Sequence, residues 1–162
     1  MKNLLTAISF FGLFLTMHGQ KVTVSELFKY QKNDAEYFES AALKNGFEYT
    51  STEDSTDANI ITYSFYQLKG TRSAHSLSYY AWKNDFRTVT YQTTVREEYI
   101  ALKIEAKKLG FKIYKTQRIK NEIEECYKKN ELCVCFNTSI NQPDPETTIF
   151  LIDVRPSAVV QD

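Results

Sequence analysis

Two stretches of the chain carry apolar residues at helical spacing, and each begins with the same start signal. Thr23-Val24-Ser25-Glu26 and Thr94-Val95-Arg96-Glu97 both place Thr at the N-cap and Glu three residues later, which is the capping-box pattern. After the second box, apolar residues recur every three or four positions until Gly110, where we expect the helix to end. These positions are Val95, Tyr99, Leu102, Ala106 and Leu109. The pattern predicts one main helix in each half of the chain.

Most of the remaining apolar residues follow the two-residue period of β-strands. Ile61, Tyr63 and Phe65, for example, alternate with polar neighbours, as in a half-buried strand. Clusters of Asn, Asp and Gly separate these segments and predict turns that join antiparallel neighbours. The segment from Thr148 to Ile152 is nearly apolar throughout, which is typical of a central strand. The expected strands lie near residues 47–51, 58–66, 75–83, 87–93, 111–117, 122–129, 132–137 and 147–154.

The two halves match one another at an offset of 64 positions. The capping boxes are 71 positions apart, so the first helix either begins about two turns earlier or is broken near Asn33-Asp34. Identical or similar apolar residues at the offset indicate an internal repeat. The matched pairs are Ala35 and Tyr99, Phe38 and Leu102, Ala42 and Ala106, Lys44 and Lys108, Gly46 and Gly110, Phe47 and Phe111, and Tyr63 and Tyr127.

This organisation predicts an α+β fold built from two α-β4 repeats, about residues 21–93 and 94–156, with a short C-terminal tail. The eight strands should form one antiparallel sheet with two main helices packed on one face. A parallel α/β sheet is the weaker alternative, because too few helices separate the strands.

Residues 1–20 have the pattern of a secretory signal peptide. Lys2 precedes an apolar run from Leu4 to Leu15, and the small residue Gly19 follows. The run is too short to span a bilayer. We expect cleavage near Gly19 or Gln20, export to the periplasm or the medium, and a single domain from residue 21 to residue 162.

The composition narrows the possible function classes. The chain has 20 basic and 20 acidic side chains, a balance that argues against a nucleic-acid binder or a binder of anionic membranes. Five glycines and three prolines beside eleven Tyr and eleven Phe indicate a folded, aromatic-rich domain. Residues 21–162 contain no apolar run long enough for a membrane helix.

The three cysteines predict a disulfide and one free thiol in an exported chain. If Asn130-Glu131 is a two-residue hairpin loop, Cys126 faces Cys135 at a non-hydrogen-bonded pair, where side chains approach most closely. We therefore expect a Cys126–Cys135 disulfide. Cys133 lies diagonal to Cys126 and should be the free thiol, although it could also compete for Cys126 or pair between chains.

The same register separates the two faces of this hairpin. The cysteines, Glu124 and Lys128 should face solvent or a partner, and the opposite residues should face the helices. The helix-facing set is Ile123, Tyr127, Leu132, Val134 and Phe136. A three-thiolate metal site is the alternative, but zinc binds four ligands and the one histidine after the leader, His75, lies in the other half.

Aromatic residues mark a candidate binding face. With a three-residue loop at residues 84–86, Tyr80 and Trp82 lie on the face that the helices leave open. Large aromatic residues in such positions are typical interface anchors. With a two-residue loop the parity reverses, and Trp82 joins Val89 and Tyr91 in the core. Tyr66 is a third candidate anchor.

The sequence carries no recognisable catalytic motif: it has no Gly-rich phosphate loop, no G-x-S-x-G and no H-E-x-x-H. His75 begins a predicted strand without a nucleophile nearby in sequence, which favours a strand-edge residue. We therefore expect a non-catalytic protein without a metal or other cofactor.

Two resemblances bear on function. Glu36-Tyr37-Phe38, Lys44-Asn45-Gly46-Phe47 and Val89-Thr90-Tyr91-Gln92-Thr93 resemble segments of small exported proteins of the Bacteroidetes without assigned function. The tandem helix-plus-four-strands plan is similar to the architecture of the beta-lactamase inhibitor protein, which binds enzymes through a concave, aromatic-rich sheet. That family has a characteristic disulfide in each repeat, and this feature is absent here, since residues 21–125 contain no Cys.

These observations lead to a binding module that presents its open sheet face to a protein partner, with Tyr66, Tyr80 and Trp82 as anchors. A structural or envelope-associated protein is the alternative. A small-molecule carrier is a third class and would need a cavity between helices and sheet. The sequence leaves the oligomeric state open.

Overall fold

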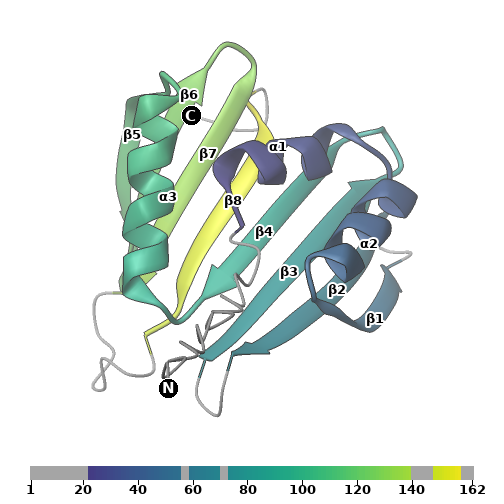
Figure 1. Ribbon diagram of the computed structural model, residues 1–162. Coiled ribbons are helices and arrows are strands. Elements are labelled where there is room, and N and C mark those ends of the chain that lie inside the picture. The colour runs from purple at the N-terminus through teal and green to yellow at the C-terminus, as the bar shows by residue number, and fades with distance from the viewer. Residues whose placement is uncertain (1–21, 56–58, 70–72, 140–147, 158–162) are drawn as a thin grey trace, which may run out of the picture.

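Eight strands form one antiparallel sheet in the order β1-β2-β3-β4-β8-β7-β6-β5 (Figure 1). The computed structural model describes residues 22–55, 59–69, 73–139 and 148–157, so the expected signal peptide lies outside the described residues. The α+β class, the antiparallel pairing and the central position of the last strand are confirmed. The strands are β1 Glu48–Ser55, β2 Ile60–Lys69, β3 Ser73–Trp82, β4 Arg87–Thr93, β5 Lys112–Ile119, β6 Glu122–Lys129, β7 Leu132–Ser139 and β8 Phe150–Pro156.

Three helices, rather than the two expected, lie on one face of the sheet (Figure 1). They are α1 (Val24–Lys32), α2 (Ala35–Lys44) and α3 (Arg96–Lys108). The first expected helix is broken at Asn33-Asp34, which was the second of the two alternatives. Asn33 ends α1, and Asp34 begins α2 by accepting a hydrogen bond from the Tyr37 N–H at 2.9 Å.

The two capping boxes have different outcomes. Thr23 and Glu26 form the expected box, with the Glu26 N–H donating to Thr23 Oγ1 at 3.1 Å and the Thr23 N–H donating to Glu26 Oε2 at 2.9 Å. The box predicted at Thr94 is wrong, because the N-cap is Val95 and makes no side-chain cap. Just before the helix, the Val95 N–H donates to Thr93 Oγ1 at 3.0 Å.

The hydrophobic core lies between the helices and the sheet. Helix α2 packs over β1, β2 and β3, whereas α1 and α3 pack over β4 and β8. In the first half, Phe38 is fully buried, and its ring centroid lies 5.0 Å from that of Tyr79 and 5.4 Å from that of Phe65. In the second half, Tyr99 packs against Phe136 and Phe150. These contacts fix which sheet face is covered.

The loop between β3 and β4 sets the parity of Trp82. The loop has three residues, as expected, but it comprises Lys83, Asn84 and Asp85 rather than residues 84–86. Asp85 adopts a left-handed conformation at φ 62°, and its N–H donates to the Trp82 carbonyl at 3.1 Å. The β3–β4 pairing is therefore shifted from the expected register by an even number of residues. Only an odd shift would exchange the two faces, so the side chains of this hairpin stay on their expected faces.

In the described part of the chain, no helix is both long and apolar enough to cross a membrane.

Candidate functional site

The face of the sheet opposite the helices, called the open face below, carries the candidate site. Along β3, Leu77 and Tyr79 are buried toward the helices, whereas Tyr80 and Trp82 are only partly buried and lie on the open face. The core position that the alternative parity assigns to Trp82 is therefore wrong. Tyr66 pairs with Ser76 in the β2–β3 ladder, but its side chain lies outside the described residues.

Three aromatic residues gather at the end of this hairpin. The Trp82 ring packs edge-on against Phe86, with centroids 4.9 Å apart, and lies 6.2 Å from Tyr80. A hollow of about 450 Å³ lies beside them, lined by Asn59, Trp82, Lys83 and Asn84. Phe86 was missed in the sequence because it was assigned to the loop, although it pairs directly with Trp82 through a 2.9 Å backbone hydrogen bond.

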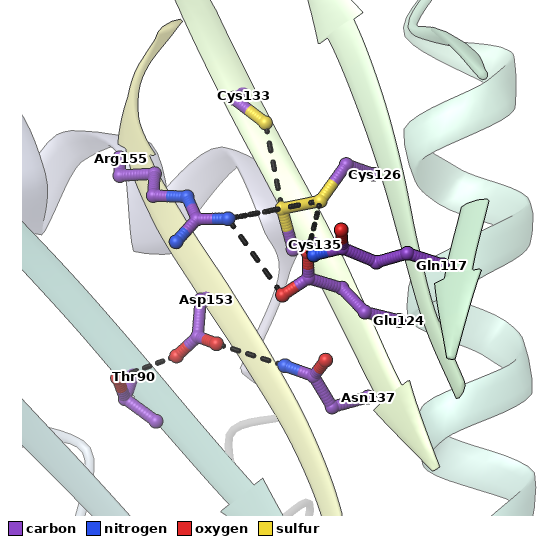
Figure 2. Close-up of polar contacts among 9 residues, drawn as sticks. All are labelled: Thr90, Gln117, Glu124, Cys126, Cys133, Cys135, Asn137, Asp153 and Arg155. Atoms are coloured by element: carbon purple, nitrogen blue, oxygen red, sulfur yellow. Dashed lines mark hydrogen bonds and ion pairs between the residues drawn. A yellow bond between two sulfur atoms is a disulfide. The ribbon is translucent and has the colours of Figure 1, made fainter. Parts of the chain in front are cut away.

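A charged network crosses the centre of the same face (Figure 2). Asp153 of β8 accepts a hydrogen bond from Thr90 at 2.6 Å and another from Asn137 at 2.9 Å, so it links β4, β8 and β7. Loss of hydration raises the pKa of Asp153 above its ordinary value, and the two hydrogen bonds oppose that effect only in part. Through its two hydrogen bonds, Asp153 connects strands of the two halves of the sheet.

Arg155 and Glu124 continue this network over β6 and β7. The Arg155 guanidinium lies 3.7 Å from Glu124 Oε2, and Gln117 donates to Glu124 Oε1 at 2.9 Å. Arg155 Nη2 also lies 3.1 Å from Cys135 Sγ and 3.7 Å from Cys126 Sγ. Figure 2 shows the guanidinium directed at the pair of sulfur atoms.

The cysteines form a separate buried cluster. Cys126 and Cys135 are opposite one another in the β6–β7 ladder, as expected for the two-residue Asn130-Glu131 loop, and their sulfur atoms are 2.02 Å apart in a disulfide. Cys133 is the free thiol, 3.5 Å from Cys135 Sγ. Burial raises the pKa of the Cys133 thiol, so the protonated form is favoured.

The expectation that the cysteines face solvent or a partner is wrong in one respect. They lie on the open face, but all three have an exposed fraction of 0%. Long side chains from neighbouring strands lie across them: Arg155 reaches over the disulfide, and the Tyr114 hydroxyl hydrogen-bonds Cys133. The helix-facing residues of this hairpin follow the expectation except Ile123, which is 40% exposed near the sheet edge.

On the covered face, His75 is buried rather than a strand-edge residue. Its exposed fraction is 1%, and its Nε2 lies 2.8 Å from Glu98 Oε2 on α3. The same carboxylate oxygen accepts hydrogen bonds from the Tyr91 hydroxyl at 3.1 Å and the Thr93 hydroxyl at 3.2 Å. This cluster was missed because Glu98 is remote from His75 in sequence. The available signal was the alternation along the strand: His75 lies two residues before Leu77, so the two side chains share the covered face.

A hollow of about 270 Å³ lies where α1 meets β5 and the β6–β7 hairpin. Phe28, Phe111 and Leu132 line it, together with Lys29 and Lys129. The Phe28 and Phe111 rings stack at 5.0 Å and fill the layer beside it. The hollow is slightly smaller than the roughly 300–1,000 Å³ that pockets for drug-sized ligands occupy, so it gives the carrier hypothesis little support.

Comparison of the chain with known protein families, curated proteins and solved structures finds no match in any of the three.

Proposed function

We propose that this chain is an exported, non-catalytic binding protein that engages another protein through the open face of its sheet. Tyr80 and Trp82 would be the main anchors, with Phe86 supporting Trp82 and Tyr66 as a further candidate. The observation that carries the proposal is the aromatic group on a sheet face that no described helix covers.

The surroundings of the aromatic group support this role. Tyr80 pairs with Thr88 across the β3–β4 ladder, and the next strand, β8, carries Arg155 immediately after the Val89–Val154 pair. Neighbouring strands are about 5 Å apart, so Arg155 lies about 10 Å from Tyr80 along one row of the face. Tyr and Trp are residue types that interface hot spots favour. Arg155 is engaged with Glu124 and Cys135 and would border the aromatic group rather than join it.

The test begins with affinity capture from envelope and secreted fractions, using residues 21–162 as bait. Trp82→Ala is run in parallel, and Tyr37→Ala is the matched control because Tyr37 is a 41% exposed aromatic on the helix side. A captured protein is then purified and its affinity measured for all three chains. We expect Trp82→Ala to weaken binding by roughly 30-fold or more, which corresponds to the loss of one hot-spot residue, and Tyr37→Ala to have little effect.

Thermal unfolding of the same variants separates loss of the site from loss of the fold. Because Trp82 is only partly buried, the variant should keep a cooperative transition close to that of the wild type. A partner bound equally well by Trp82→Ala would contradict the assignment of the site. No partner for either chain would favour the alternative, a structural or envelope-associated protein.

Two finer expectations belong to this proposal: export by a signal peptide at residues 1–20, and an origin of the domain in two repeats. Features at the 64-residue offset support the repeat. Gly46 and Gly110 both have positive φ values, 79° and 88°, and the edge strands β1 and β5 both carry a register shift, after Tyr49 and after Ile113. The architectural similarity to the beta-lactamase inhibitor protein leads to the same proposal of a sheet-mediated binder.

A further inference from the structure

We propose that Cys126, Cys133 and Cys135, with Glu124, form a redox-gated site for a thiophilic d¹⁰ cation, Zn²⁺ in the first place. The site would be closed while the Cys126–Cys135 disulfide is intact and would become available on its reduction. This role is separate from partner binding by the aromatic group.

The spacing of the sulfur atoms suits such a cation. All three Sγ atoms lie within 4.8 Å of one another, and Cys133 Sγ is 3.5 Å from Cys135 Sγ. Tetrahedral zinc with Zn–S bonds of about 2.3 Å needs sulfur atoms about 3.8 Å apart. The two disulfide sulfur atoms must separate by rotation of their side chains, and the Glu124 carboxylate must turn toward Cys133. Both movements leave the β6–β7 ladder paired.

Glu124 would supply the fourth ligand that the sequence lacked, once its carboxylate turns toward the three sulfur atoms that lie within 4.8 Å of one another. Its Oε1 lies 3.3 Å from Cys126 Sγ, and a disulfide sulfur has no proton to donate to it. A cation placed beside both atoms would bind the two electron-rich groups at once. Gln117 already donates a hydrogen bond to this oxygen at 2.9 Å, which is the kind of outer contact that orients a metal ligand.

The charge balance favours a closed structural site. Three thiolates and one carboxylate exceed the charge of Zn²⁺ by two negative charges, and the Arg155 guanidinium, 3.1 Å from Cys135 Sγ, would offset one of them. The sulfur ligands are fully buried, and with Glu124 as the fourth ligand the protein would fill all four tetrahedral positions, as in structural zinc sites. Soft thiolates select zinc or monovalent copper over magnesium or calcium.

Formation of the site balances as two steps. An external dithiol breaks the Cys126–Cys135 bond, supplies two electrons and two protons, and leaves as a disulfide. Zn²⁺ then replaces the protons of the three thiols, which are released to solvent as three Zn–S bonds form. Because each thiol must lose its proton to bind the cation, affinity should increase with pH.

The test titrates residues 21–162, reduced with a phosphine under oxygen-free conditions, with Co²⁺ and then Zn²⁺. We expect one Co²⁺ per chain, thiolate-to-metal absorption in the near ultraviolet, strong visible bands of a tetrahedral ion, and displacement by Zn²⁺. The oxidised chain is the matched control because its sequence is identical, and it should give none of these signals.

Two variants test the ligands. Cys133→Ser keeps the disulfide pair and should weaken zinc binding by about 100-fold or more, whereas Glu124→Gln should weaken it by about 10-fold and shift the visible bands. Glu122→Gln removes an exposed carboxylate of the same strand, two residues before Glu124, and should bind zinc like the wild type.

Three results would overturn the proposal: no metal bound by the reduced chain, Cys133→Ser binding as tightly as the wild type, or equal binding by the oxidised chain. If the reduced chain unfolds without metal, Zn²⁺ should restore its far-ultraviolet circular dichroism, because the binding free energy then contributes to folding. Failure of that recovery would also contradict the site. Binding of Cu⁺ without Zn²⁺ or Co²⁺ would refute the role of Glu124.

Discussion

Removal of the Glu98 carboxylate should be among the most destabilising single changes on the covered face. Glu98 Oε2 lies within 3.2 Å of three side-chain groups, from His75, Tyr91 and Thr93. All three residues are at least 97% buried, and Glu98 itself retains 19% exposure. The carboxylate therefore attaches the start of α3 to β3 and β4.

The expected loss follows from the groups left behind by Glu98→Ala. A buried donor without an acceptor costs about 1–3 kcal/mol. The Thr93 hydroxyl retains its contact with the Val95 N–H, whereas His75 Nε2 and the Tyr91 hydroxyl lose the acceptor they share. We expect the free energy of unfolding to fall by about 3–5 kcal/mol, allowing for partial relaxation around the two strongly affected groups.

The measurement is equilibrium urea unfolding followed by circular dichroism. Glu97→Ala is the matched control, because Glu97 is the preceding residue of the same helix turn and is exposed. It should change the free energy of unfolding by less than about 0.5 kcal/mol. If the two variants unfold at the same urea concentration, Glu98 does not satisfy the buried donors, and the argument for the cluster fails. Glu98→Gln, which keeps one acceptor, should fall between them.

Three further changes test features on both faces. Thr23→Ala should lower the free energy of unfolding by about 1 kcal/mol because it removes a formed cap, whereas Thr94→Ala should lack this penalty. Thermal unfolding compares the two variants, and equal losses of stability would contradict the assigned caps. Cys135→Ser should lower the free energy of unfolding by about 2–3 kcal/mol, because it opens the short disulfide loop. If reduced and oxidised wild type unfold at the same urea concentration, the disulfide does not contribute this stability. Because burial raises the folded-state pKa of Asp153, its carboxylate lowers stability above that pKa, and the penalty disappears as the pH falls toward the unfolded value of about 3.9. Asp153→Asn should therefore gain stability relative to wild type as the pH rises above about 4; a pH-independent difference in urea midpoints would refute this sign.

The strands and their faces could be predicted because side-chain direction in a strand alternates with every residue. The Asn130-Glu131 turn shows the strength of this argument: once the loop length is known, all positions of the β6–β7 ladder follow, including the opposition of Cys126 and Cys135. For the β3–β4 hairpin the assumed loop was displaced by one residue. The faces were nevertheless correct because the loop still contained three residues.

What lies over a sheet face could not be predicted from alternation. The parity of Cys133 is a local property, but the side chains of Tyr114 and Arg155 that interact with it come from other strands. The pairing of His75 with Glu98 likewise depends on how α3 sits on the sheet. The second capping box failed because α3 begins one residue later than expected, with Val95 at the N-cap, and the Val95 side chain has no acceptor for the N–H groups of the first turn.

The position of β8 has a consequence for the order of assembly. Phe150–Pro156 is the last strand in the sequence, yet it pairs with β4 on one side and β7 on the other. The N-terminal four strands and the three strands β5–β7 can each form hairpins early, but they cannot be joined until the end of the chain is available. Pairing across such a sequence separation is slow, because the loop entropy is lost before the contacts form. A chain truncated before Phe150 would lose the middle of its sheet rather than an edge, and two unpaired strand edges would remain open to association with other chains.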